Sequence, residues 1–161
     1  MKFDVSAFDI FDREWALLTA GEAESFNTMT ISWGGLGTLW GKPVATVYVK
    51  PVRYTHEFME RSEFFTVSFY PEEYRRALGL LGSQSGRDGD KVAAAGLTPV
   101  ALDGAVTFRV ARVTLRCRKI YRQELDVSAM PAEAVRTYYT TEAPHTMYIG
   151  EVVDILRPDE V

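Results

Sequence analysis

The run Val106–Leu125 constrains the fold more than any other part of this sequence, because its side chains alternate between two classes. One face carries Phe108, Val110, Arg112, Thr114, Arg116, Arg118 and Ile120, and the other carries Arg109, Ala111, Val113, Leu115, Cys117 and Lys119. The second face is apolar through its middle, whereas the first is basic. Since successive side chains of a strand point to opposite faces of a sheet, the pattern predicts a long strand, or a bent pair, with one wet side.

Shorter runs rich in β-branched and aromatic residues surround this one, and Gly, Pro and Asp separate nearly all of them. They predict strands over Trp15–Gly21, Ser25–Trp33, Val44–Lys50, Phe64–Tyr70 and His145–Leu156. Short helices are predicted over Tyr54–Ser62, Pro71–Ser83, Gly89–Gly96 and Met130–Tyr139. Many strands with few, short helices favour a closed or partly closed antiparallel barrel.

Length and charge limit the class of protein. The 161 residues are expected to form one domain, 1–161. A formal net charge of −4 gives no general attraction to nucleic acid or to anionic membranes. Met1–Trp15 mixes acids among its apolar residues, unlike a signal peptide, and the single Cys117 rules out an internal disulfide. We therefore expect a soluble, cytoplasmic domain with neither nucleic acid nor membrane as partner.

Metal binding and hydrolysis find no support in the motifs. His56 and His145 lie far apart, Cys117 has no nearby second cysteine, and no G-x-S-x-G sequence occurs. We expect no metal site, a surface or helix-packing role for His56, and a core position for Cys117.

The segment Phe26–Gly35 carries small hydroxyls at every second position. Thr28, Thr30 and Ser32 alternate with Met29, Ile31 and Trp33. A surface strand would carry charges here, and a fully buried strand would carry aliphatic residues on both faces. The pattern leaves open a solvated face or a surface against which a ligand lies.

Two further segments have the composition of an anion site. Val47–Thr55 delivers Arg53, Tyr54 and Thr55 to the start of a predicted helix, where free N–H groups attract phosphate. Gly82–Lys91 combines glycines and serines with two cations, although it lacks the ending of a Walker loop. Each has a plainer interpretation, a helix cap and a solvated loop, but their occurrence together favours a phosphorylated ligand.

The segment Ser32–Pro43 combines four glycines with Trp33 and Trp40. One interpretation is a hairpin loop whose tryptophans close the end of the barrel. The other is a wall for a flat heteroaromatic ring. The sequence does not choose between them.

Four blocks taken in order resemble the flavin reductase-like family, and most closely the flavoredoxin-like branch of FMN-binding split barrels. The blocks are FNTMTISWGGLGTLWGKPVATVYVKPVRYT, GSQSGRDGDK, CRKIYRQEL and HTMYIGEV, and the resemblance covers roughly residues 26–153. It implies a mainly β fold, a six-stranded antiparallel split β-barrel of Greek-key type. It also implies a homodimer with one non-covalent FMN per subunit near the interface.

The resemblance also implies roles for single residues. Asn27, Met29, Thr30, Ser32 and Trp33 match the strand along the flavin, Arg53, Tyr54 and Thr55 match the ribityl-phosphate turn, and Ser83, Ser85, Gly86, Arg87 and Lys91 match the phosphate loop. His145 corresponds to the histidine of the family's Gly-Asp-His motif near the flavin and nicotinamide, and is the candidate catalytic residue. Its alternative is a structural role at the start of the last strand.

The function implied is an NAD(P)H-dependent flavin reductase, with NADH or NADPH as donor. Here Ala143-Pro144 precede His145 in place of Gly-Asp. This departure favours an alternative, a flavoredoxin-type electron carrier that a partner protein reduces. A third hypothesis is a binding module without cofactor, against which the intact Ser, Thr, Arg and Lys set argues.

Overall fold

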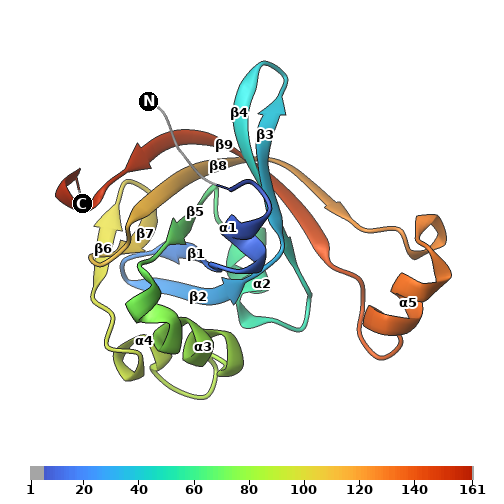
Figure 1. The fold of residues 1–161 in the computed structure, drawn as a ribbon, viewed down its shortest axis with the longest axis horizontal. Helices are drawn as coiled ribbons and strands as arrows, with labels where there is room; N and C mark the ends of the chain where they lie inside the picture. The colour runs from blue at the N-terminus through green and yellow to red at the C-terminus, as the bar shows by residue number, and fades with distance from the viewer. Residues whose placement is uncertain (1–5, 161) are drawn as a thin grey trace.

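A curved antiparallel sheet dominates the computed structural model, which describes residues 6–160 (Figure 1). The strands are β1 (Ala16–Glu22), β2 (Ser25–Ile31), β3 (Gly34–Leu39), β4 (Lys42–Val49), β5 (Phe64–Phe69), β6 (Pro99–Leu102), β7 (Ala105–Phe108), β8 (Val113–Glu124) and β9 (Thr146–Leu156). The helices are α1 (Asp9–Asp12), α2 (Tyr54–Arg61), α3 (Arg75–Ser83), α4 (Lys91–Ala94) and α5 (Ala132–Tyr138), with short 3₁₀ turns at Glu72–Tyr74, Val127–Ala129 and Pro158–Glu160. Residues 1–5, where the segment judged unlike a signal peptide begins, lie outside this description.

Seven strands form the main sheet in the order β2-β1-β5-β8-β9-β4-β3, and β6 pairs with β7 in a small second sheet. A mainly β antiparallel fold with a few helices was predicted, and this is confirmed. The predicted number of six strands and the Greek-key arrangement are not confirmed. The additional strand of the main sheet is β3, which lies in the glycine-rich segment expected to be a loop.

The β3–β4 hairpin escapes prediction because of its turn. Leu39 pairs with Lys42, so Trp40 and Gly41 form a two-residue turn, with φ angles of 52° and 71°. A two-residue turn of type I′ needs positive φ at both positions, a requirement that normally selects Asn-Gly. Trp40 at the tip is 65% exposed, so it does not fill the inside of the curled sheet, and it lines none of the three cavities described below.

The two edges of the main sheet are joined by a very short connection. β2 ends at Ile31 and β3 begins at Gly34, yet these strands stand at opposite ends of the sheet order. Two linking residues let the Cα atoms of Ile31 and Gly34 lie at most about 11 Å apart. The sheet must therefore curl until its edges approach each other at this point.

The core lies inside the curled sheet, and a second cluster lies under the helices. Buried side chains from β1, β4, β5 and β8, with Phe58 and Met59 of α2, form the first. Leu17 of β1 joins Leu78 and Leu81 of α3 in the second. Because both of its faces are covered, β1 is apolar almost throughout.

The alternation in the long run identified above is confirmed only in part. Val113, Leu115 and Cys117 are buried and Arg118 is exposed, but Phe108 and Thr114, expected on the wet face, are also fully buried. The small sheet covers this part of the face, where Thr114 Oγ1 lies 2.6 Å from Thr107 Oγ1 of β7. Of the two forms predicted, the bent pair is correct, since β7 ends at Phe108 and β8 begins at Val113. Cys117 is fully buried, as expected, and burial raises the pKa of its thiol.

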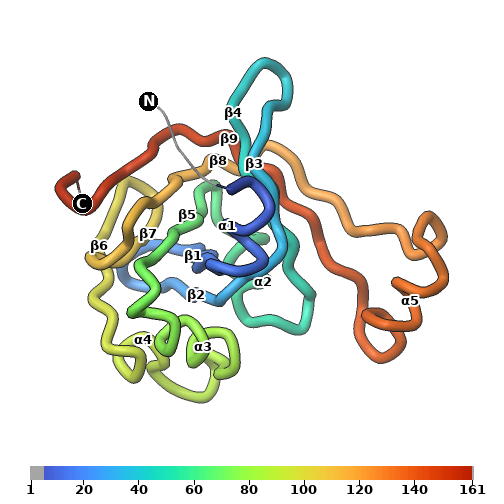
Figure 2. Tube along the Cα trace, viewed as in Figure 1, coloured from blue at the N-terminus to red at the C-terminus, as the bar shows by residue number. Residues whose placement is uncertain are grey.

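Two parts project from the curled sheet. One is the β3–β4 hairpin, and the other is the connection between β8 and β9, residues 125–145, which carries α5 and which we call the arm (Figures 1 and 2). Among residues 6–160, no helix has the length and apolar character required to span a membrane.

Candidate functional site

A groove lies beside the free edge of β2 and consists of three adjoining cavities. We call them the polar, middle and apolar pockets, and their volumes are about 200, 250 and 530 Å³. Met29 and Arg53 line both the polar and the middle pocket, and Trp33 and His145 line both the middle and the apolar pocket. The three cavities are therefore neighbours in one row.

The fold brings nearly all of the predicted site residues to this groove. The polar pocket gathers Asn27, Met29, Arg53, Tyr54, Thr55, Ser83, Ser85, Gly86 and Lys91, and the middle pocket adds Thr30, Ser32, Trp33 and His145. Among the predicted residues, Arg87 alone lines none of the three pockets. Segments far apart in the sequence thus converge on one surface.

The N-terminus of α2 forms one wall of the polar pocket. Arg53 is the N-cap residue, and Tyr54 and Thr55 open the helix. Asn27 Nδ2 donates a hydrogen bond to Thr55 Oγ1 at 2.8 Å, which leaves the hydroxyl proton of Thr55 able to donate to a ligand. Unpaired backbone N–H groups of the first turn add partial positive charge.

The loop between α3 and α4 forms the opposite wall, and Gly86 lies closest to β2. A Cβ atom at this position would stand 2.1 Å from Asn27 Oδ1 and 3.2 Å from Tyr54 Cδ1. Only glycine allows the loop backbone to approach so closely. Ser85 Oγ accepts a hydrogen bond from the Arg87 backbone N–H at 3.2 Å, and therefore keeps its own proton for another acceptor.

Lys91 is a buried cation at the bottom of the polar pocket. Its Nζ donates to the carbonyl oxygens of Leu81 and Gln84 at 2.9 and 3.0 Å and so caps the C-terminal end of α3. Two of its three N–H groups are thereby used. Burial, together with the nearby positive charge of Arg53, lowers the pKa of Lys91 to about 8.

Arg53 is exposed, at the junction of the polar and middle pockets. Its guanidinium forms neither a hydrogen bond nor an ion pair with any residue in the range 6–160. A planar cation of this kind binds carboxylates and phosphates through paired hydrogen bonds.

Arg87 and Ser83 are more engaged than the sequence suggests. The Arg87 guanidinium pairs with Glu57, donates to the Val52 carbonyl at 3.3 Å and stacks 4.6 Å from the centre of the Tyr54 ring. Through these contacts Arg87 holds the α2 wall of the polar pocket in place without lining the pocket itself. Ser83 Oγ donates its proton to the Leu80 carbonyl at 3.1 Å.

The hydroxyls of β2 differ in their surroundings. Thr28 Oγ1 lies 2.8 Å from Thr19 Oγ1 in a fully buried pair, and Thr30 Oγ1 donates to the Leu78 carbonyl of α3 at 2.5 Å. These two hydroxyls tie β2 to its neighbours. Ser32 has no side-chain hydrogen bond to the described residues and lines both the middle and apolar pockets.

An aromatic group surrounds His145. Tyr139 Oη lies 2.8 Å from His145 Nδ1, and the Trp33 ring centre lies 5.3 Å from the imidazole. Burial, with the nearby charges of Lys50 and Arg53, lowers the pKa of His145 to about 4. The imidazole is therefore neutral at neutral pH.

Sequence reasoning missed the residues that the arm and β4 bring to the groove. Lys50 Nζ donates to Glu142 Oε2 at 2.6 Å and to the Tyr138 carbonyl at 2.9 Å. Tyr138 packs edge-on against Trp33, with ring centres 5.1 Å apart, and Tyr48 lines the middle pocket. The aromatic pair Tyr138-Tyr139, a few residues before Ala143-Pro144-His145, is the sequence signal that could have indicated the arm.

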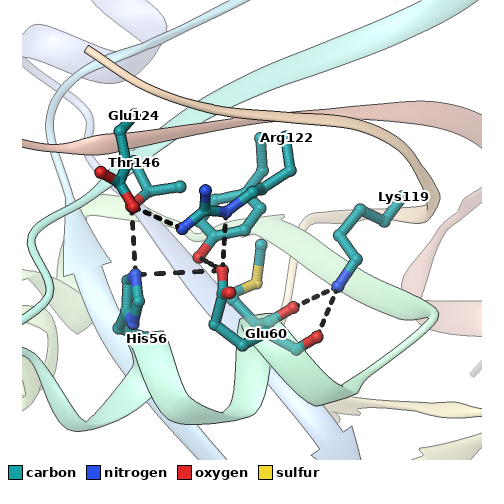
Figure 3. Close-up of polar contacts among 8 residues, drawn as sticks. His56, Glu60, Lys119, Arg122, Glu124 and Thr146 are labelled. Carbon is teal, nitrogen blue, oxygen red and sulfur yellow. Dashed lines mark hydrogen bonds and ion pairs between the residues drawn. The ribbon is translucent and has the colours of Figure 1, made fainter. Parts of the chain in front are cut away.

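The opposite side of α2 is anchored by a polar network (Figure 3). Glu60 Oε1 accepts from Tyr148 Oη at 2.5 Å and from Arg122 Nε at 3.2 Å. His56 Nε2 lies 3.1 Å from Thr146 Oγ1, next to His145 in the chain. His56 is partly buried in this network, as the expected helix-packing role requires. Burial lowers the pKa of its imidazole.

Within residues 6–160, no group of three or more His, Cys, Asp or Glu side chains is arranged to hold a metal ion. The groove instead offers uncharged donors and cations at one end and aromatic surface at the other.

Comparison with known proteins identifies one family. Its sequence model, described as "Flavin reductase like domain", matches residues 8–161. Among curated proteins, none matches this sequence.

Solved structures provide further comparisons. Flavoredoxin from Methanosarcina acetivorans has 19% identity and a TM-score of 0.73, over 98% of this chain and 74% of the other. FMN-binding protein from Thermus thermophilus with bound 1-cyclohex-2-enone has 18% identity and a TM-score of 0.72, over 99% and 81%. The NADH:FAD oxidoreductase of Streptomyces globisporus C-1027 has 19% identity and a TM-score of 0.68, over 89% and 74%. At these identities the likeness establishes the fold.

Proposed function

We propose that this chain, which belongs to the flavin reductase-like domain family, binds FMN non-covalently and acts as a redox protein. The specific activity we propose is NAD(P)H-dependent flavin reduction by a single domain, residues 1–161, with the split-barrel form of the fold. The observation that carries the proposal is the continuous groove, polar at one end and aromatic at the other.

The polar pocket fits the phosphate end of FMN. A phosphate monoester carries close to two negative charges at neutral pH. Arg53 is unpaired among the described residues, Lys91 has one N–H group left, and Thr55 and Ser85 have protons to donate. Gly86 lets the loop backbone approach closely. We assign Arg87 the supporting role of holding Tyr54 in place.

The middle and apolar pockets suit the flat ring. Met29 and Trp33 offer apolar surface, and Ser32 offers a hydrogen bond at the edge. FMN, when bound, supplies the redox chemistry, and the protein contributes position and electrostatics. We assign Thr30 to holding β2 against α3, since its proton is used there.

His145 is the proposed catalytic residue. With Nδ1 accepting from Tyr139, the ring proton of the neutral imidazole is on Nε2. That N–H can donate to a ligand in the middle or apolar pocket, orient a nicotinamide, or polarise the ring edge. NADH or NADPH would enter on the side that the arm borders.

The second candidate is an electron carrier of flavoredoxin type. Ala143-Pro144 in place of Gly-Asp favours it, because this pair precedes His145, in the region where a nicotinamide would lie. A partner protein, rather than NADH or NADPH, would then supply the electrons. We retain the homodimer and the cytoplasmic location as part of both candidates.

The test begins with the visible spectrum of the purified protein and the quenching of FMN fluorescence on addition of the protein. We expect a bound flavin spectrum. NADH or NADPH is then added without oxygen, and bleaching of the flavin absorbance identifies a reductase. Bleaching that needs a reduced partner protein identifies the carrier. A colourless protein that leaves FMN fluorescence unchanged contradicts both and revives the binding module without cofactor.

A further inference from the structure

One carboxylate lines the polar pocket together with its cations. Glu142, from the arm, shares this cavity with Arg53 and Lys91, and no other acidic side chain of residues 6–160 lines it. Its Oε2 atom lies 2.6 Å from the Nζ of Lys50, which borders the adjoining middle pocket. A negative charge at this place opposes the binding of any anion there.

We propose that Glu142 acts as an internal competitor of the ligand's phosphate and thereby sets how tightly a phosphorylated flavin is held. The inference rests on the proposed function, since it concerns the same groove. It assigns an affinity-determining role to a residue that contributes no favourable contact to the ligand.

The competition follows from charge and geometry. Lys50, and at longer range Arg53, hold the pKa of Glu142 below its usual value, so the side chain is ionised at neutral pH. If Glu142 keeps its place, it repels the phosphate and neutralises Lys50. If the phosphate displaces it, the pair with Lys50 is lost. In either case the carboxylate weakens phosphate binding.

The fold does not depend on this pair. Lys50 also donates to the Tyr138 carbonyl at 2.9 Å, and the Tyr138 ring packs edge-on against Trp33. These contacts hold the arm against the groove without Glu142. The ion pair is partly exposed, and pairs of this kind add little to stability. The role that remains for Glu142 is electrostatic.

The consequence is discrimination between flavins. Riboflavin has the same ring and ribityl chain as FMN but no phosphate, so Glu142 has no charge to oppose. The carboxylate therefore narrows the difference in affinity between FMN and riboflavin. It favours a flavin that exchanges over one that stays permanently bound.

The experiment compares Glu142→Gln with the charge-matched control Glu133→Gln. Glu133 lies on α5 of the same arm and forms no ion pair with the described residues. Dissociation constants of FMN and riboflavin are measured for wild type and both variants by flavin fluorescence, at low salt. We expect Glu142→Gln to bind FMN on the order of tenfold more tightly, with riboflavin unchanged, and Glu133→Gln to match wild type.

The outcomes separate this inference from the proposed function. If neither wild type nor either variant binds FMN or riboflavin, the proposed function fails, and the inference fails with it. If wild type binds FMN and Glu142→Gln binds it no more tightly, the inference alone is overturned. An equal gain for both flavins also overturns it, because the effect is then not on the phosphate. Should the amide keep its contact with Lys50, Glu142→Ala must show the same selective gain.

Discussion

The two sides of helix α2 differ in how completely their charged side chains are paired. On the side of β8 and β9, Glu60 is paired with Tyr148 and Arg122, and Arg122 also with Glu124 (Figure 3). On the groove side, Arg53 has no such partner among residues 6–160. Paired charges on the first side hold the helix in place. On the groove side Glu57 is paired with Arg87, and Arg53 remains available to a ligand. The pairing of charges therefore distinguishes the structural side of α2 from the side that faces the groove.

The largest effect should come from the unpaired cation. We expect Arg53→Gln to weaken FMN binding about 100-fold, because a charge-assisted pair of hydrogen bonds to phosphate is lost. Riboflavin affinity and the free energy of unfolding should barely change, since Arg53 has no side-chain partner to lose. Fluorescence titration and urea unfolding provide the two measurements.

Arg76→Gln is the matched control, because Arg76 is exposed on α3 and makes no ion pair with the described residues. If Arg53→Gln lowered the free energy of unfolding by as much as it weakened the free energy of FMN binding, the distinction between the two sides of α2 would be contradicted.

The second effect concerns the paired side. We expect Glu60→Ala to lower the free energy of unfolding by about 2 kcal/mol, because the hydroxyl of the buried Tyr148 loses its acceptor and Arg122 loses a partner. FMN affinity of the folded protein should stay close to wild type. Urea unfolding followed by circular dichroism measures the first quantity. Should Tyr148→Phe in the Glu60→Ala background recover none of the loss, the unpaired hydroxyl is not its cause.

The third effect is a pH dependence from Lys91. Its pKa is about 8 in the folded chain, against an ordinary value of 10.5. Below pH 8 the ammonium is charged in both states. Between pH 8 and 10.5 the unfolded chain binds more protons, so the free energy of unfolding should rise with pH. FMN binding favours the charged form, so its affinity should fall over the same range, by up to about tenfold.

Parallel urea unfolding and FMN titrations between pH 7.5 and 10 measure these opposite slopes. Lys91→Met should flatten both. A wild type in which stability and affinity change in the same direction would contradict this assignment to Lys91.

The smallest effect is expected at the rim of the network. Glu124→Gln removes one partner of Arg122, but this pair is largely exposed and Arg122 keeps Glu60. We expect a change below about 0.5 kcal/mol in the free energy of unfolding and none in FMN affinity. A loss as large as that of Glu60→Ala would show that the network acts as one unit.

Much of the fold could be predicted because it is written in local patterns. The alternation of Val113, Leu115 and Cys117 follows from the period of a strand and needs no knowledge of its partners. The strand β3 could not be predicted, since Trp40 adopts a turn conformation that its residue type rarely allows.

The site was predictable in composition and less so in detail. A sequence shows that Arg53 and Arg87 are both available, but not that Glu57 engages one and leaves the other unpaired. The Lys50–Glu142 pair joins positions 92 residues apart, and no local pattern reports such a contact. Charge compensation is a property of the folded chain, so it was out of reach of the motifs.

The position of β9 in the sheet has a consequence for synthesis on the ribosome. This strand lies between β8 and β4, although it is the last strand in the sequence. The β3–β4 hairpin therefore emerges early, and the edge of β4 that pairs with β9 stays unpaired until residues 146–156 have been synthesised. At about 5–20 residues per second, the interval from β4 to β9 lasts on the order of 5–20 seconds. Until then the hairpin is a nascent edge in need of protection, and the groove does not yet exist.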